Sequence, residues 1–381
     1  MIDAVNAEAS TGKAVLVQNE AGDVHLNTSD PRQRVLLNGL DVHAELQRLN
    51  LWNHRLHTGV CFIRNGGVFL DAQTLSGLPP GVDKWRRGVR ARNGKIYGIP
   101  RAATAVLIID PASNTYDITT MTGFATDVYK WADGVLAGNG KIYCIPEQTT
   151  MVLVIDPKYD VFDASTISVA GYLVSGESGN WEAAVLADNG KIYAVPNTNT
   201  HVLVINPDTN TTSTIAVNGA DNTNYKWFGA VLARNGKIYG IPYRATSILI
   251  TDSADATTLT LDGNTGGGMG DNGPSSDFDF GWAGGVLAQN GLIYGIRTTR
   301  WAGGVVVDDG RILGVPFSAS SVLTIQPTTN SVGLVTSAAS FDSTVMGARW
   351  FGGVEAEDGR IFAIPAAATS ILVIDPLCMS T

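Results

Sequence analysis

A tryptophan-led segment recurs seven times along the chain, and this repeat constrains the fold more than any other feature. One copy reads WFGAVLARNGKIYGIP, and the copies begin at Trp85, Trp131, Trp181, Trp227, Trp282, Trp301 and Trp350. Six copies continue into a second apolar run, such as HVLVINP, that starts 20 residues after the tryptophan. The Trp282 copy lacks this run because Trp301 follows it 19 residues later. A spacing held this strictly indicates a structural repeat.

Each unit has the pattern of short strands. The apolar GVLA run leads into Asn-Gly or Asp-Gly, the pair that a tight hairpin turn favours because both central residues need positive φ. KIYGIP predicts a second strand that ends at proline. The VLVID run, rich in β-branched residues, predicts a third strand that ends at Asp-Pro. A Thr/Val/Ile segment such as TTSTIAV then predicts a fourth strand.

Four antiparallel strands in a unit of 46 residues, counted from Trp85 to Trp131, are typical of a β-propeller blade. We therefore expect an all-β propeller over residues 58–381, with seven blades favoured and six as the alternative. We expect residues 58–78 to complete the last blade with the C-terminal unit. We expect the tryptophans to pack between adjacent blades, and the small residues after them to lie where the innermost strands crowd the axis.

The repeat resembles the WxGGVLAxNGKIYGIP…SVLVIDP repeats of uncharacterised propeller-like proteins of marine protists and large algal viruses. The resemblance covers residues 82–376 and implies the propeller fold. It implies no activity, cofactor or ligand.

Composition excludes several classes of protein. The net charge of −9 argues against a nucleic-acid partner for the chain as a whole. No apolar run is long enough to insert into a membrane, and the first residues do not form a secretory signal. Three cysteines do not form a disulfide framework, although Cys61 and Cys378 could meet at ring closure. A cytoplasmic or virion-associated protein is favoured, and we expect no cofactor.

Residues 1–57 lie outside the repeat and predict a hairpin around Glu20–Asp23, followed by a short helix over about residues 41–56. This segment resembles the attachment stalks of viral fibre and capsid proteins, which implies attachment and oligomerisation. The helix has a heptad seam with a core-type asparagine, a residue that can fix oligomeric state. It could join copies of the chain or pack on its own propeller. The seam residues are Val42, Leu46, Leu49, Asn53 and Leu56.

The connections between blades and the turns between second and third strands emerge at one end of a propeller. These connections vary in length here, and variable loops commonly carry function. We therefore expect this end to be the binding face for a protein partner or a surface glycan. Its candidate residues are Arg101, Glu147, Asn197, Tyr243, Arg244 and Phe317.

The first unit is unusually basic, and charged residues follow some tryptophans where other units have Ala, Gly or Phe. Innermost strands would place these residues at the mouth of the central channel. The basic groups could attract an acidic or sulfated glycan or an acidic protein. The alternative is that they form salt bridges with Asp133 or Glu182 in neighbouring blades. The channel-mouth and basic-patch candidates are Arg86, Arg87, Arg90, Asp133 and Glu182.

No nucleophile, base and orienting group occur in a recognisable pattern. The long loop over residues 261–280 offers Asp262, Asn264 and Asp271 as candidate calcium ligands, although a flexible polar loop is favoured and we expect no metal site. The sequence thus predicts a non-enzymatic recognition or attachment protein. The alternatives are a structural subunit of a larger assembly and a polysaccharide hydrolase or lyase that uses Asp133 and Glu182.

Overall fold

The computed structural model describes residues 14–18, 24–28, 36–37, 40–41, 70–71, 75–126, 129–174, 179–217, 224–262, 281–297, 300–336 and 348–376. Contacts divide the chain into two units, Met1–Ile63 and Arg64–Thr381. None of the described residues forms a helix that is long and apolar enough to cross a membrane.

The first unit contains two small antiparallel sheets. Strands β1 (Ala14–Gln18) and β2 (Val24–Thr28) form the hairpin predicted around Glu20–Asp23. Strands β3 (Leu36–Leu37) and β4 (Leu40–Asp41) form the second pair. Asp41 lies in β4, so the helix expected to begin there does not include it. The other residues of that helix, with its whole heptad seam, lie outside the described residues.

The second unit is a β-propeller with six four-stranded antiparallel blades among its described residues, and a single 3-10 turn, η1 (Ala170–Tyr172). Strand order follows the chain in five of these blades, whereas the outer strand of the sixth, β5, comes from the N-terminal side of the repeat. Blade 1 contains β6 (Trp85–Arg90), β7 (Ile96–Pro100), β8 (Leu107–Asp110) and β9 (Thr115–Asp117). Blade 2 contains β10 (Trp131–Leu136), β11 (Ile142–Pro146), β12 (Leu153–Asp156) and β13 (Val161–Asp163). Blade 3 contains β14 (Trp181–Leu186), β15 (Ile192–Pro196), β16 (His201–Asn206) and β17 (Thr211–Ala216).

The chain then forms three further blades. Blade 4 contains β18 (Trp227–Leu232), β19 (Lys237–Pro242), β20 (Ser247–Asp252) and β21 (Thr257–Asp262). Blade 5 contains β24 (Trp301–Val306), β25 (Ile312–Pro316), β26 (Ser321–Gln326) and β27 (Ser331–Thr336). Blade 6 contains β28 (Trp350–Glu355), β29 (Ile361–Pro365), β30 (Leu372–Ile374) and β5 (Leu70–Asp71).

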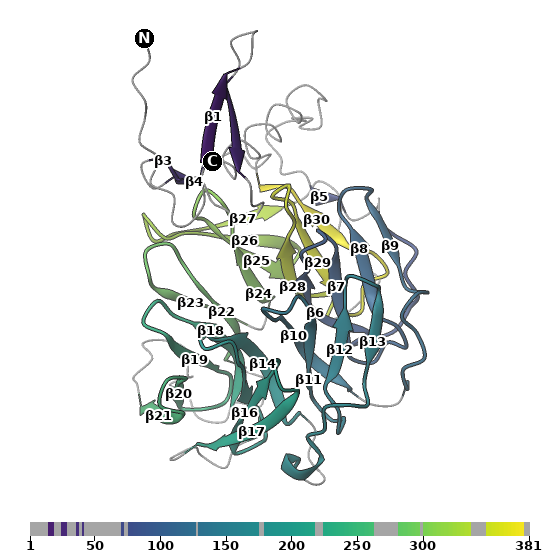
Figure 1. Ribbon diagram of the computed structural model, residues 1–381, viewed down its shortest axis with the longest axis vertical. Coiled ribbons are helices and arrows are strands. Elements are labelled where there is room, and N and C mark those ends of the chain that lie inside the picture. The colour runs from purple at the N-terminus through teal and green to yellow at the C-terminus, as the bar shows by residue number, and fades with distance from the viewer. Residues whose placement is uncertain are drawn as a thin grey trace. The chain divides into compact units, whose positions relative to one another are not determined.

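The first strands of the units lie innermost around a common axis, and the later strands lie toward the outside (Figure 1). Strand β28 of blade 6 packs beside β6 of blade 1, which closes the ring. Strand β5, which falls within the segment 58–78, pairs with β30 and supplies the outer strand of blade 6. Both ends of the repeat region therefore contribute to one sheet.

The expectation of seven complete blades is not matched. The Trp282 unit forms only a two-stranded sheet, β22 (Trp282–Leu287) and β23 (Ile293–Arg297), between blades 4 and 5. The physical reason is the one visible in the sequence: Trp301 starts the next innermost strand before a third strand can form. This two-stranded sheet, here called the truncated sheet, keeps the inner ring continuous but has no outer half among its described strands.

The constant spacing of 20 residues has a direct cause. In every four-stranded blade the indole N–H of the leading tryptophan donates a hydrogen bond to the backbone carbonyl 20 residues later, at the start of the third strand. The tryptophan ring also packs between blades, as expected: Trp131 shares a cluster with Ile99 of blade 1 and Leu153 of blade 2. One side chain therefore fixes both the strand register and the blade interface.

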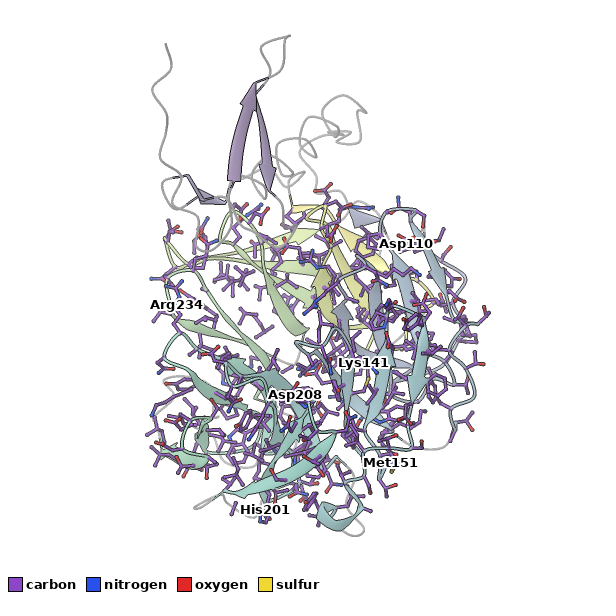
Figure 2. All side chains as sticks on the ribbon, in the orientation of Figure 1. Asp110, Lys141, Met151, His201, Asp208 and Arg234 are labelled. Atoms are coloured by element: carbon purple, nitrogen blue, oxygen red, sulfur yellow. The ribbon has the colours of Figure 1, made fainter. Side chains whose placement is uncertain are left out.

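Backbone amides form a relay at the tryptophan end of the blades. In five units, those led by Trp85, Trp131, Trp181, Trp227 and Trp350, the residue before the tryptophan donates its N–H to the turn between the second and third strands of the preceding blade, as Lys130 does to Arg101. Its carbonyl then accepts from the same turn in its own blade, as Lys130 does from Glu147. In Figure 2, Met151 and His201 mark this end of blades 2 and 3, and Lys141 and Asp208 mark the opposite end.

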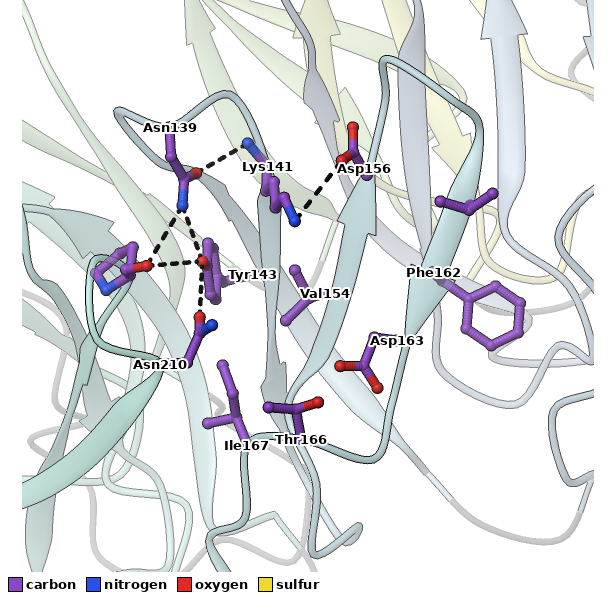
Figure 3. Close-up of a pocket in the computed structure, with 12 residues that line it drawn as sticks. Asn139, Lys141, Tyr143, Val154, Asp156, Phe162, Asp163, Thr166, Ile167 and Asn210 are labelled. Atoms are coloured by element: carbon purple, nitrogen blue, oxygen red, sulfur yellow. Dashed lines mark hydrogen bonds and ion pairs between the residues drawn. The ribbon is translucent and has the colours of Figure 1, made fainter.

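The opposite end is joined by a different contact. Asn139 of an Asn-Gly turn donates to the Tyr143 hydroxyl, which donates to the Pro207 carbonyl of the next blade (Figure 3). Blades 5 and 6 have leucine or phenylalanine at the tyrosine position and Asp-Gly-Arg at the turn. There Arg360 pairs with Asp358 and donates to the Pro111 carbonyl of blade 1 at 2.6 Å. The change from Asn-Gly-Lys to Asp-Gly-Arg therefore preserves the blade contact when the tyrosine is lost.

Small residues are required where the innermost strands meet, as expected. A Cβ added to Gly229 would lie 2.9 Å from the Cα of Gly284, and one added to Gly303 would lie 3.1 Å from the Cα of Gly352. At the interfaces between blades, side chains rather than backbone atoms restrict the size of a residue: a Cβ added to Gly134 would lie 2.6 Å from Cδ1 of Ile99.

We predict that Gly134→Ala destabilises the protein by about 1–3 kcal/mol, because the added methyl group overpacks the interface with Ile99. Gly138→Ala, in the same blade, is the matched control because its Cβ would meet no atom within 4 Å. Urea unfolding of the two variants measures the difference. Equal stabilities would show that the interface between blades 1 and 2 is not close-packed.

Candidate functional site at the channel mouth

Most of the residues predicted for the binding face and for the channel mouth meet in one place. Trp85 pairs with Pro100 across the first two strands of blade 1, so the residue after the tryptophan lies beside the turn after the proline. The same pairing recurs in the other blades, for example between Trp181 and Pro196. The two predicted groups are therefore neighbours at the tryptophan end of the ring.

Arg86 lies at the centre of this arrangement. Its guanidinium group lies 2.6 Å from Glu182 of blade 3 and 3.8 Å from Glu147 of blade 2. It also lies over the rings of Phe228 in blade 4 and Phe351 in blade 6, at 5.0 and 4.4 Å from their centroids. A single side chain from blade 1 thus contacts four other blades and occupies the channel. Its Nε has no hydrogen-bond partner within the part of the chain that the structure describes.

Arg101 and Glu147 form a bidentate ion pair at the mouth. The guanidinium donates to both carboxylate oxygens of Glu147, at 2.8 and 2.7 Å, in the bidentate geometry that favours arginine over lysine. Arg101 also pairs with Asp83 at 2.9 Å and lies 3.6 Å from the ring centroid of Tyr129. The turns of blades 1 and 2 are therefore joined by side chains as well as by the amide relay.

Arg87 crosses the channel next to Arg86. It pairs with Asp133 of blade 2 at 3.2 Å and donates to the Phe228 carbonyl of blade 4 at 2.6 Å. Asp133 also accepts the backbone N–H groups of Gly134 and Ala184. Burial raises the pKa of Asp133, and the Arg87 charge lowers it. Arg87 has a positive φ of +54°. Gly352, at the equivalent position of blade 6, also has a positive φ.

Glu182 is fully buried beneath these groups, and Asn197 donates to it at 3.3 Å. Burial raises the pKa of Glu182 to about 7, while the ion pair with Arg86 lowers it. Three guanidinium groups, Arg86, Arg87 and Arg101, therefore face four carboxylates across the mouth. We call Arg86, Arg101, Glu147, Glu182 and Asn197 the mouth cluster.

The other side of the mouth is aromatic. Tyr243 stacks on Phe228 with ring centroids 4.2 Å apart, and Phe317 meets Phe351 edge-on at 5.9 Å. Phe228 and Phe317 pack together with Phe351 and the small residues that follow neighbouring tryptophans. We call Phe228, Tyr243, Phe317 and Phe351 the aromatic ledge. Tyr243 and Phe317 are half-buried, and the adjacent Arg244 is exposed.

Of the two interpretations of the basic first unit, salt bridging is the one that the structure shows. Arg86 and Arg87 pair with Glu182 and Asp133, as that interpretation stated. Arg90 is exposed at the far end of β6, where it lies near Glu355 rather than at the mouth. Glu147 and Asn197, expected on a binding face, are 3% and 1% exposed. Their side chains act within the protein rather than on its surface.

Several predicted sites lie outside the described residues. Asn264 and Asp271 are among them, and only the backbone of Asp262 is described, at the end of β21. Cys61 and Cys378 are also outside the described residues, whereas Cys144 is a buried free thiol. Among described residues, no group of three histidine, cysteine or carboxylate side chains is placed to hold a metal ion.

Two of the cavities in the described part of the propeller contain polar groups. The first, about 150 Å³, lies along the axis beside Arg87, Asp133 and Phe351 and is lined mainly by glycines of the innermost strands. The second, about 200 Å³, lies at the opposite end, where Lys141 pairs with Asp156 and Tyr143 bonds Asn210 (Figure 3). The polar groups of the second cavity belong to the contact between blades 2 and 3. The axial cavity is the one that adjoins the mouth cluster.

Sequence reasoning did not single out Phe228 and Phe351, although both follow a repeat tryptophan. The signal was present, because two of the seven units carry phenylalanine where most others carry a small or charged residue. Their partner Arg86 stands at the same position of another unit. A comparison of this one column across the repeat would have brought the three residues together.

Comparison with solved structures supports the class that the fold defines. The chain is similar to a streptogramin B lyase, with 12% identity, a TM-score of 0.60, and coverage of 80% of this chain and 96% of that one. It is also similar to a selenomethionine-substituted virginiamycin B lyase from Staphylococcus aureus, with 9% identity, a TM-score of 0.57, and coverage of 80% of this chain and 98% of that one. An auxiliary nutrient binding protein from Bacteroides ovatus is similar at 13% identity and a TM-score of 0.51, with coverage of 81% of this chain and 77% of that one.

These identities are low, so the likeness is one of fold: the protein is a β-propeller of four-stranded antiparallel blades. No protein-family model matches the chain, and no curated protein sequence does. Function must therefore be argued from the site.

We predict that the free energy of unfolding decreases between pH 5 and pH 8, and that this decrease is larger in the native protein than in the Glu182→Gln variant. A carboxyl whose pKa is raised to about 7 holds its proton in the folded state after the unfolded chain, near 4.5, has released it. The folded state then binds more protons, so unfolding free energy decreases as pH rises through this window. The limiting slope is about 1.4 kcal/mol per pH unit.

Urea unfolding at both pH values, for both proteins, measures this difference. The comparison cancels the contribution of Glu355, whose pKa burial also raises to about 7. Parallel pH profiles for the two proteins would show that Arg86 keeps Glu182 ionised throughout.

Proposed function

We propose that the protein is a non-enzymatic recognition protein whose propeller binds a surface glycan or a protein partner at the aromatic ledge. The observation that carries the proposal is the stack of half-buried Tyr243 on Phe228 beside exposed Arg244, at the mouth of the ring. The charged half of the mouth is internally paired, so the aromatic half is the part that can present surface to a ligand.

The chemistry of the ledge fits a sugar better than a small ion. An aromatic face offers apolar contact area, and the phenolic hydroxyl and a guanidinium add hydrogen bonds that fix orientation. Burial raises the pKa of Tyr243 to about 12, so its hydroxyl stays protonated and can donate a hydrogen bond at neutral pH. A carboxylated or sulfated sugar would add a charge-assisted contact to Arg244.

The fold is compatible with binding and with catalysis, since its neighbours include a nutrient-binding protein and lyases. A polysaccharide hydrolase or lyase would use Asp133 and Glu182, and the raised pKa of Glu182 is what a general acid requires. Both carboxylates, however, neutralise buried arginines and are 6% and 0% exposed. Their present arrangement favours a structural role in shaping the mouth.

We predict that Tyr243→Ala weakens binding of a ligand found on a glycan array by at least about tenfold, a typical cost of removing an aromatic anchor. Tyr243→Phe should keep most of the affinity because the stack on Phe228 remains. Tyr159→Ala is the matched control, since Tyr159 is 65% exposed in a turn at the opposite end of blade 2. Titration calorimetry with the full chain measures the three affinities.

Unchanged affinity in Tyr243→Ala would place the binding site elsewhere. A full chain that retains no glycan on the array and no protein in pull-down would contradict the recognition function itself. Activity on a polysaccharide that Glu182→Gln and Asp133→Asn abolish would favour the hydrolase or lyase.

A further inference from the structure

Among the described tryptophan-led units, only the truncated sheet leaves the edge of its second strand unpaired. In blade 5 the second strand, β25, is fully buried because β26 pairs with it. In the truncated sheet, no described strand pairs with the outer side of β23, and Ile296 is the one buried residue of that strand. Leu292, at the start of this edge, is 59% exposed. Unpaired strand edges with apolar side chains are templates for adding another strand.

Blade 4 forms an apolar wall on one side of this gap. In blade 3, Ile215 pairs with Val202 and packs in the cluster of Trp227, which belongs to the next blade. Leu261 stands at the same register in blade 4, opposite Ile248, but the truncated sheet that follows has no outer half among the described strands. Leu261 is 45% exposed and Leu259, two residues earlier on the same side of β21, is 56% exposed.

Blade 5 forms the opposite wall. In blade 4, Thr258 faces the preceding blade and donates to the Ala216 carbonyl there. Val332 stands at the same register of blade 5, opposite Ile325, so it faces the truncated sheet. Val332 is 67% exposed, and Leu334 on the same side of β27 is 56% exposed. We call the space over β23 between these two walls the blade gap.

The N-terminal hairpin has the sequence of the missing half-blade. Strands β1 and β2 pair residues Ala14–Gln18 with Val24–Thr28, and strands β26 and β27 pair residues 321–325 with 332–336 in the same way. The two hairpins can therefore be compared position by position. Five of the ten positions are identical, including the VxLxT pattern of the outer strand: Val15, Leu16, Val24, Leu26 and Thr28 match Val322, Leu323, Val332, Leu334 and Thr336. The described residues thus form six complete blades, one half-blade, and one hairpin of outer-blade type.

We propose that the β1–β2 hairpin of a second copy of this chain fills the blade gap and completes a seventh blade. Among the described residues, β1–β2 and β22–β23 are each two-stranded sheets, so each has an unpaired edge. Reciprocal donation between two copies would pair both edges and give a closed dimer. The main-chain hydrogen bonds would supply affinity, and the alternating side chains would meet the apolar walls.

The pairing in blade 5 fixes the expected register. There Gly314 lies opposite Leu323 and Leu313 opposite Thr324. The equivalent residues of the truncated sheet are Gly295 and Tyr294, so Tyr294 should lie opposite Val17 of the donated strand. Directly opposed residues in an antiparallel pair have Cβ atoms about 4.5–5.5 Å apart, close enough for an engineered disulfide.

Single-cysteine variants of the full chain test the proposal. With Cys61→Ser, Cys144→Ala and Cys378→Ser as background, we expect a mixture of Val17→Cys and Tyr294→Cys chains to form a disulfide-linked dimer under mild oxidation. The matched control replaces Tyr294→Cys by Val161→Cys, a residue 53% exposed on the outer strand of the complete blade 2. The dimer yield should exceed the control by at least about tenfold, because pairing raises the local thiol concentration.

Two results would overturn the proposal. One is no excess of dimer over the control. The other is a Val17→Cys, Tyr294→Cys double variant that forms its disulfide only within one chain, which would show that the chain completes its own ring.

Substitutions in the two apolar walls of the blade gap test the proposed dimer independently of the disulfide experiment. Light scattering of the full chain should show a dimer, and Leu259→Asp with Leu334→Asp should convert it to a monomer. Both side chains are exposed, so the substitutions leave the propeller folded, which circular dichroism checks. Val161→Asp should leave the dimer intact. A dimer that survives both wall substitutions would contradict the proposed docking surface.

Discussion

The propeller depends on the amide relay at the tryptophan end of its blades. In five units the residue before the tryptophan donates to the preceding blade and accepts from its own: the Lys226 N–H, for example, donates to the Asn197 carbonyl, and the Lys226 carbonyl accepts from the Tyr243 N–H. Hydrogen bonds of this kind contribute only about 1 kcal/mol each, but their partners are buried and costly to leave unpaired. The indole bond 20 residues downstream then fixes the third strand. The repeat is conserved along the chain where these two contacts require it and varies elsewhere.

The fold could be predicted from the sequence because its determinants are local and repeated. The Asn-Gly turns, the prolines that end the second strands and the tryptophan spacing each report a contact within one blade or with its neighbour. The incomplete Trp282 unit was visible for the same reason. The number of complete blades was not determined by these signals, because a ring can accept a half-unit whose inner strands still pack.

The site was predicted in part. Charged residues after Trp85, Trp131 and Trp181 identified the channel mouth, but which carboxylate pairs with which arginine depends on contacts across the ring. Sequence spacing cannot show that Arg86 reaches Glu182 two blades away and lies between two phenylalanines. The sequence also could not show that the side chains of Glu147 and Asn197 are buried. Both are polar residues in turns, and they become covered only when neighbouring turns meet.

The departures from the repeat give the molecule its asymmetry. Blades 1 to 3 fill the mouth with compensating charges, whereas blades 4 to 6 present aromatic rings and small residues. The truncated sheet, which has no outer half among the described strands, lies between blades 4 and 5. A closed ring and an asymmetric surface thus coexist because the relay uses backbone atoms, which leaves the side chains at the mouth free to differ.

The central claim is that the backbone relay holds the ring together, and native-state hydrogen exchange of the full chain tests it most directly. The account predicts that the relay amides of Lys130, Asn180 and Lys226 exchange only through global unfolding, together with the buried second strands. It also predicts that amides of the outer strand β13 exchange earlier by local opening. Relay amides that exchange as early as those of β13 would show that the blades are held by side-chain packing alone, which would contradict the account.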